Sequence, residues 1–138
     1  LGLAVALEKH VGQAQEKADC IIALEIEEEG IPPLKLEAET ALFRIAQEAI
    51  SNVLKHSRCT RARVALRAEG ETLALEVADD GVGLDDSGAQ RRFAGGFGLV
   101  GMRERAETLG GSLEIKSGRG KGTSVIARLP LRRITGEV

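Results

Sequence analysis

Two alternating segments joined by a short turn place the strongest constraint on the fold of this chain. Residues 62–68 and 72–79 both alternate apolar with polar side chains, the pattern of strands that bury one face. Gly70 and Glu71 lie between the two segments, and a glycine in so short a connection indicates a β-hairpin. The chain therefore contains an antiparallel pair of strands whose apolar face must pack against other elements.

Helical patterns lie on both sides of this hairpin. Residues 3–18 and 36–57 carry apolar side chains at spacings of three and four, which predicts amphipathic helices. A shorter helical pattern at 99–109 ends at a pair of glycines, a signal for a helix C-terminus. Further strands are predicted at residues 21–27, 112–117 and 123–129. This order favours an α+β fold with a mixed sheet of about five strands and helices on one face.

The bulk properties fit one globular domain. The chain has 138 residues and a formal net charge of -2, and it lacks Trp and Tyr, so a nucleic-acid partner is disfavoured. No apolar run approaches the roughly 20 residues of a membrane-spanning helix. Cys20 and Cys59 lack metal-ligand spacing, which predicts reduced thiols in a cytosolic protein. The polar tail at 131–138 is expected to fray, and the missing initiator Met suggests a fragment of a longer chain.

The stretch A-D-D-G-V-G-L, residues 78–84, holds two adjacent aspartates with different predicted surroundings. Because the side-chain period of a strand is two, Asp79 shares the buried face of its strand, while Asp80 points outward as a solvated neighbour. A buried carboxylate needs a partner, and Gly81 and Gly83 let a ligand approach the backbone. The arrangement suits an exocyclic amine on a planar ring. A plain hairpin or Asx turn is the alternative for this stretch alone.

A polar edge borders the apolar stripe of the second predicted helix. Glu48, Asn52, Lys55 and His56 fall on one flank at the helical period. A carboxylate, an amide oxygen and a cation so placed can hold hydrated Mg²⁺ and a polyphosphate, because Mg²⁺ prefers oxygen ligands and keeps several waters. The alternative is a solvated helix edge.

A glycine-rich stretch, G-G-F-G-L-V-G-M-R-E-R at residues 95–105, leads into the third predicted helix. The free N–H groups and the dipole of a helix N-terminus favour phosphate. The stretch matches neither a Walker A loop nor a dinucleotide fingerprint, and a flexible connector is the alternative. The segment before it lacks periodicity, which is typical of a functional or mobile loop.

Together, in this order, the three motifs resemble the ATP-binding boxes of the GHKL superfamily of gyrase, heat-shock chaperone, histidine kinase and MutL ATPases. The stretch E-A-I-S-N-V-L-K-H-S resembles the N box, D-D-G-V-G-L the first glycine box, and G-F-G-L-V-G-M-R-E-R the second. The resemblance extends from about residue 34 to residue 131. It is closest to the catalytic ATP-binding domain of sensor histidine kinases in the nitrate-sensor and membrane-fluidity-sensor subfamily.

This resemblance implies a role for each candidate residue. Asn52 would be the Mg²⁺ ligand, and Glu48 the catalytic acid that orients or activates the attacking group. Asp79 would accept from the adenine amino group, with Thr123 supporting it through water. The glycines shape the adenine pocket or meet the phosphates, which Lys55 and His56 also contact. The implied nucleotide-binding residues are Asn52, Lys55, His56, Asp79, Gly81, Gly83, Gly96, Gly98, Leu99 and Thr123.

The resemblance also implies the wider architecture and partners. The fold would be a two-layer α/β sandwich, one catalytic ATP-binding domain over residues 1–138, with a mobile ATP lid at about 84–97. The domain would bind ATP and Mg²⁺ and act as a histidine protein kinase, passing the γ-phosphoryl group to a histidine on a separate dimerisation domain of a two-component system. A response regulator would follow downstream. We expect a cytoplasmic domain, monomeric in isolation, from a homodimeric parent that membrane anchoring would also suit.

Alternative functions use the same motifs. An anti-sigma-factor-type serine kinase has the same boxes, and its phosphoacceptor is a separate protein. A topoisomerase or chaperone ATPase would need dimer-clamping and transducer segments that the sequence does not show. A non-catalytic nucleotide-sensing module is disfavoured because every box residue is present. His10 lacks the following acid that is typical of phosphoacceptor histidines, so we expect the acceptor to lie elsewhere.

Overall fold

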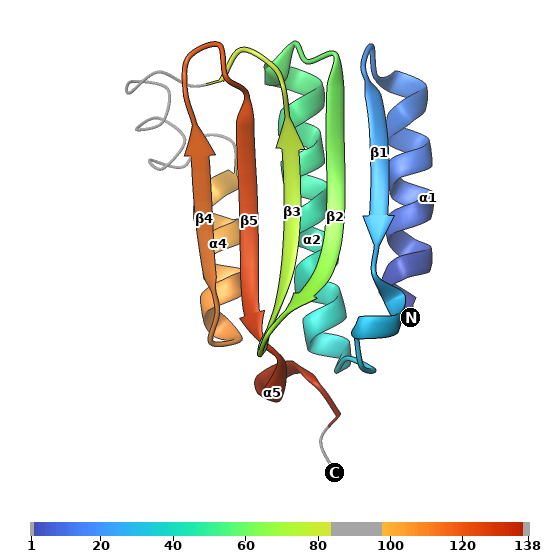
Figure 1. The fold of residues 1–138 in the computed structure, drawn as a ribbon, viewed down its shortest axis with the longest axis vertical. Coiled ribbons are helices and arrows are strands. Elements are labelled where there is room, and N and C mark those ends of the chain that lie inside the picture. Colours follow the sequence, from blue (N-terminus) through green and yellow to red (C-terminus); the bar gives the residue numbers. More distant parts are fainter. Residues whose placement is uncertain (1, 84–97, 137–138) are drawn as a thin grey trace.

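The computed structural model describes residues 2–83 and 98–136, which form one sheet covered by helices on one face (Figure 1). The sheet has five strands in the order β1-β2-β3-β5-β4. Its strands are β1 (Ile21–Ile26), β2 (Arg61–Glu69), β3 (Thr72–Asp79), β4 (Ser112–Ser117) and β5 (Thr123–Pro130). The helices are α1 (Gly2–Lys17), α2 (Leu36–Asn52), α4 (Leu99–Thr108) and the short α5 (Leu131–Ile134). A 3-10 turn (Glu28–Gly30) and a π-helical turn (Val53–Ser57) complete the order.

The sheet is mixed, as the sequence predicts. Strand β1 runs parallel to β2, and the other neighbouring pairs are antiparallel. The predicted hairpin joins β2 to β3, with Glu69 paired to Thr72 and Gly70 at φ 61°, where a glycine avoids the strain of a side chain. The α+β class and the two-layer arrangement are therefore confirmed.

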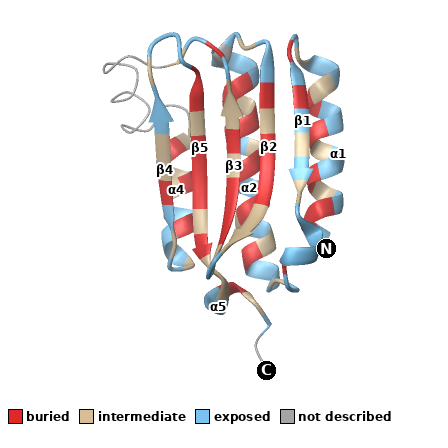
Figure 2. Cartoon of the chain, in the orientation of Figure 1, coloured by how far each residue is buried: buried red, intermediate tan, exposed pale blue. Residues whose placement is uncertain are grey.

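The core lies between the sheet and the helices, and Figure 2 shows buried residues both along the strands and along the helices behind them. The predicted apolar stripe of the long helix is buried in full: Leu42, Ile45, Ala46, Ala49 and Val53. The matching stripe on α1 packs against the same core. Because these two helices and α4 cover one face only, the other face of the sheet must be compatible with water.

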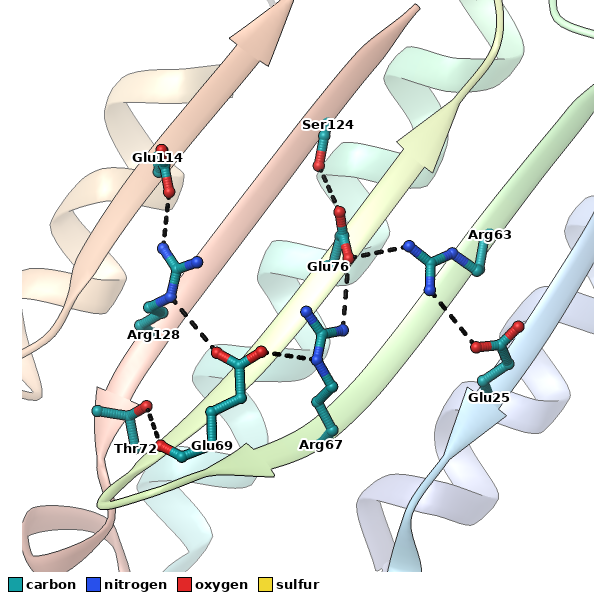
Figure 3. A network of polar contacts seen from close by, with 9 residues as sticks. All are labelled: Glu25, Arg63, Arg67, Glu69, Thr72, Glu76, Glu114, Ser124 and Arg128. Atoms are coloured by element: carbon teal, nitrogen blue, oxygen red, sulfur yellow. Dashed lines mark hydrogen bonds and ion pairs between the residues drawn. The ribbon is translucent and has the colours of Figure 1, made fainter.

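The outer face of the sheet carries a network of charged side chains (Figure 3). At its centre, Glu76 accepts hydrogen bonds from Ser124 Oγ at 2.7 Å and from Arg63 Nη2 at 3.1 Å. Arg67 adds an ion pair with Glu76 at 3.4 Å. Burial by itself would raise the pKa of Glu76, but the Ser124 hydrogen bond and the two arginines leave that pKa lowered. The network extends across neighbouring strands through Glu25, Glu69, Glu114 and Arg128.

Two local expectations were wrong. The first part of the tail is packed on the domain, because α5 places the side chain of Ile134 fully in the core. The Ile134 carbonyl also accepts a hydrogen bond from the Lys35 N–H at 2.7 Å. Thr135 then forms a β-bridge with Leu34. The second helix does not keep its α period to residue 57, because Val53–Ser57 is π-helical. No helix in the described part of the chain is long and apolar enough to cross a membrane.

Candidate functional site

A narrow cavity lies where the C-terminal end of α2 meets the ends of β3 and β5. Its polar lining consists of Asn52, His56, Asp79 and Thr123, with Gly83 at its edge. Alanine and valine side chains complete the wall. The cavity measures about 10 Å³, which is about the room that one water molecule needs. The structure thus brings together five predicted residues from three separate stretches of sequence.

Asp79 occupies the position that strand phase predicts. It is the last residue of β3, it is partly buried, and it lines the cavity beside Val77. Its Oδ1 accepts a hydrogen bond from the Gly81 N–H at 2.9 Å, so the Asx-type turn that was the alternative is also present. The carboxylate is therefore held by a nearby backbone N–H in the wall of a cavity that has both polar and apolar lining.

Thr123 is paired directly with Asp79 across the β3–β5 ladder. It is 9% exposed, and its Oγ1 lies 2.9 Å from Ser117 Oγ. Ser117 Oγ is also a donor to the Gly122 carbonyl at 3.1 Å. Thr123 is thereby held against the acid that it was predicted to support, in a cavity with room for a bridging water.

Asp80 is a solvated neighbour outside the cavity, as strand phase predicts, but it also has a structural role that the sequence does not indicate. Asp80 is exposed, but its Oδ1 accepts from the backbone N–H groups of Thr60 at 2.8 Å and of Arg61 at 3.0 Å, and its Oδ2 accepts from the Thr60 hydroxyl at 2.6 Å. The Arg61 N–H and the Thr60 donors lower the pKa of Asp80 to about 2. The two aspartates therefore have different tasks: Asp80 ties the start of β2 to the end of β3, and Asp79 faces the cavity.

The turn between β4 and β5 supports the site in a way that sequence reasoning missed. Gly122 lies against the Asp79 carbonyl, and a Cβ at either Gly122 or Gly83 would collide with backbone atoms of the facing segment. The Gly120 N–H donates to the Val82 carbonyl at 2.7 Å. The signal that could have found this contact is the alternation of three glycines, at 118, 120 and 122, directly before Thr123.

Glu48 and Gly98 form a second contact away from the cavity lining. Gly98 precedes the first turn of α4 with φ 70°, and a Cβ there would lie 2.5 Å from Glu48 Oε2. The N–H groups of that first turn form a potential anion site. Leu99, by contrast, is buried in the core at 1% exposure. Gly96 and the predicted lid at about 84–97 lie outside the described residues.

The polar edge of the second helix continues into the π-helical turn that follows α2. Asn52 and His56, four residues apart, line the cavity, whereas Lys55 is exposed outside it. Single π turns often occur at functional sites. Gly81 is buried and serves the site through its N–H.

The described residues contain no cluster of three or more His, Cys, Asp or Glu side chains that could hold a metal ion. Asn52, 9% exposed, and Glu48 one turn earlier offer one amide and one carboxylate oxygen. This donor set fits Mg²⁺, which commonly takes one or two protein ligands and completes its shell with phosphate and water.

A family model described as "Histidine kinase-, DNA gyrase B-, and HSP90-like ATPase" matches residues 37–133. Among curated proteins, the chain is 36% identical over 124 residues to the signal transduction histidine-protein kinase/phosphatase DegS of Bacillus subtilis, covering 90% of this chain and 31% of DegS. It is 40% identical over 93 residues to the sensor histidine kinase LiaS of Bacillus subtilis, covering 67% of this chain and 25% of LiaS. The chain thus spans only about a quarter to a third of the length of these relatives.

Solved structures share the fold. The histidine kinase domain of a blue-light activated histidine kinase from Erythrobacter litoralis EL346 superposes with a TM-score of 0.76 at 22% identity, over 95% of this chain and 62% of that one. Acinetobacter baumannii histidine kinase AdeS gives a TM-score of 0.72 at 12% identity, over 94% of this chain and 64% of AdeS. At these identities the likeness concerns the fold alone.

Proposed function

Because the chain belongs to the histidine kinase-, DNA gyrase B-, and HSP90-like ATPase family and is similar along most of its length to sensor histidine kinases, we propose that it is their ATP-binding catalytic domain. In this proposal one domain over residues 1–138 binds Mg²⁺-ATP. The γ-phosphoryl group then passes to a histidine on a separate dimerisation domain, and a response regulator acts downstream.

The observation that carries the proposal is the cavity in which three separate stretches of the sequence meet. Asn52 and His56 come from the end of the long helix, Asp79 and Gly83 from the end of β3, and Thr123 from the start of β5. A carboxylate beside an apolar wall can accept from the amino group of adenine, and a threonine next to it can hold a bridging water. Such a site selects a nucleobase by its hydrogen-bonding edge.

The proposed phosphate side of the site lies next to the adenine cavity. Asn52 lines that cavity, and Glu48 lies one turn before it on the same helix. Glu48 in turn contacts Gly98 at the N-terminus of α4. We propose that the triphosphate extends from the cavity toward this helix end, with Asn52 as the Mg²⁺ ligand and Glu48 positioning the attacking group. The proposal also includes the other nucleotide-binding residues that the resemblance implies, which are Lys55, His56, Gly96 and Leu99. When bound, Mg²⁺ would neutralise phosphate charge, which is the main requirement of phosphoryl transfer.

The finer assignments are part of the same proposal. The Asn-Lys-His order of the first motif and the second glycine box support the nitrate-sensor and membrane-fluidity-sensor subfamily. We place the domain in the cytoplasm as part of a homodimeric parent.

The metal role can be tested by titrating the 138-residue chain with a non-hydrolysable ATP analogue, with and without Mg²⁺. Asn52→Ala should lose most of the Mg²⁺-dependent gain in affinity, because it removes the proposed ligand. Gln47→Ala, a matched control on the same helix outside the cavity lining, should keep that gain. If Asn52→Ala keeps the full gain, the proposed metal ligand is wrong.

The kinase assignment needs the parent protein. Incubation of the full-length parent with ATP labelled on the γ-phosphate should place phosphate on a histidine outside the present chain. A parent that binds ATP but never carries phosphohistidine would favour the nucleotide-sensing alternative.

A further inference from the structure

Two thiols that the proposed function does not use lie side by side at the nucleotide end of the sheet. Cys20 directly precedes β1 and Cys59 lies just before β2, and these parallel strands start together because Ile21 is paired with Arg61. The Ile21 N–H donates to the Thr60 carbonyl at 3.0 Å, which fixes the two strand entries against each other. The two cysteine side chains are close enough to influence each other, and both pack against the same core.

The two thiols differ in their access to solvent. Cys20 is 7% exposed, whereas Cys59 is only partly buried, and both are free. Burial raises the pKa of Cys20 to about 12, and the hydrogen bond with Cys59 adds to the rise. Because Cys59 is the more exposed of the two, it is the thiol that an oxidant in solution meets first, and Cys20 lies behind it as the partner thiol.

We propose that Cys20 and Cys59 form an oxidation site that a peroxide converts into an intramolecular disulfide. The Cys59 sulfur attacks one peroxide oxygen, which yields Cys59 sulfenic acid and one water per hydrogen peroxide. The Cys20 sulfur then attacks the sulfenic sulfur, and the leaving hydroxide takes the Cys20 thiol proton as a second water. Two thiols lose two electrons in total, and the peroxide gains them.

The disulfide would form next to a residue whose backbone conformation is unfavourable. Arg58, next to Cys59, has φ 54° and ψ 39°, and it is the single non-glycine residue with positive φ among those described. Such a backbone conformation is unfavourable for a residue with a side chain and persists only where its surroundings hold it. On the other side, Thr60 is held by its two hydrogen bonds to Asp80. A short segment therefore links Cys59 to both the π-helical turn with His56 and the end of β3.

Oxidation should reach the nucleotide site through this segment. The sulfurs must approach to a covalent distance of about 2.05 Å, and that displacement acts on Thr60 and on its bonds to Asp80. The proposed adenine acid lies at the same end of the sheet, because Asp79 is paired with Ala62 and Ala62 is paired with Ile22. This second part of the inference rests on the proposed function, and loss of one hydrogen bond to a charged group predicts about tenfold weaker ADP binding.

The test is to treat the reduced 138-residue chain with hydrogen peroxide, block remaining thiols with an alkylating agent, and analyse intact mass and proteolytic peptides. We expect loss of both thiols together, a monomer lighter by two hydrogen atoms, one peptide that joins Cys20 to Cys59, and full reversal by dithiothreitol. Cys20→Ala and Cys59→Ser should each abolish the joined peptide. Peptide mapping of the wild-type chain decides the question even if a variant fails to fold.

Stable sulfenic or sulfinic acid at Cys59 with an intact Cys20 thiol, or disulfides only between chains, would overturn the disulfide. ADP affinity is then compared between the reduced and the disulfide-bonded chain. Equal affinities would overturn the coupling and leave the disulfide standing. A reduced chain that binds no ADP would instead refute the proposed function, and the peroxide result would be unaffected.

Discussion

Replacement of Gly122 by alanine tests how the β4–β5 turn positions the candidate adenine acid. Gly122 has φ 78° and packs against the Asp79 carbonyl so closely that an added Cβ would collide with backbone. Gly120, two residues earlier in the same turn, has nearly the same φ of 74°, yet nothing lies within 4 Å of the position of its Cβ. Alanine at Gly120 and alanine at Gly122 should therefore have similar backbone strain, but only the alanine at Gly122 should collide with its neighbours.

The expected magnitudes follow from this difference. An alanine held in left-handed backbone costs roughly 1–2 kcal/mol of unfolding free energy, so Gly120→Ala should lose about that much. Gly122→Ala should lose the same amount plus roughly 1–3 kcal/mol for overpacking, about 2–5 kcal/mol in total. Because the strands must part to make room, the Asp79 carboxylate should also shift.

Urea unfolding of both variants and of the wild-type chain measures the free energies, and titration with ADP measures the site. We expect near wild-type ADP affinity for Gly120→Ala and at least about tenfold weaker binding for Gly122→Ala, since misplacement on the order of 1 Å can be that costly in a site. Equal stability losses in the two variants would refute the claim that contact with Asp79, rather than backbone conformation, requires Gly122.

Three further changes probe the support of the fold. Asp80→Asn should lower stability near neutral pH, and its difference from wild type should shrink as pH falls from about 3.8 toward 2, because a carboxylate with a lowered pKa stabilises the fold only while it is ionised. A pH-independent difference in urea unfolding would contradict this. Glu76→Gln should cost about 1.5–3 kcal/mol, because Ser124 and the arginines lose a charged partner; an unchanged urea midpoint would argue against the network. Ile134→Ala should cost about 2–5 kcal/mol if the tail is packed as described, and a loss below about 0.5 kcal/mol would indicate a frayed tail.

Much of the architecture is local and could be predicted. Alternation over residues 72–79 predicts β3 with its observed bounds, because a strand with one buried face must follow the period of two. The same period assigns Asp79 to the cavity side without any knowledge of the neighbouring strands. The buried stripe of the long helix follows equally from its period of 3.6.

The rest depends on contacts between distant segments. Ile134 lies in a polar tail, and only its pairing with the segment before α2 buries it. The chain changes from α-helical to π-helical after Asn52, and no pattern in the apolar stripe marks where the period changes. The bonds of Asp80 to Thr60 cross 20 residues of sequence, so strand phase could show only that the side chain points outward.

The most direct test of the account is the preference of the site for adenine over hypoxanthine. ADP offers an exocyclic amine to Asp79, whereas IDP carries an oxygen there and would face the carboxylate with an acceptor. We predict that the wild-type chain binds ADP about 10–100-fold more tightly than IDP, the value of one hydrogen bond to a charged group. Asp79→Asn should lose most of that preference while its circular dichroism stays unchanged. A folded Asp79→Asn chain that binds ADP with wild-type affinity and rejects IDP as strongly as before would contradict the assignment of Asp79.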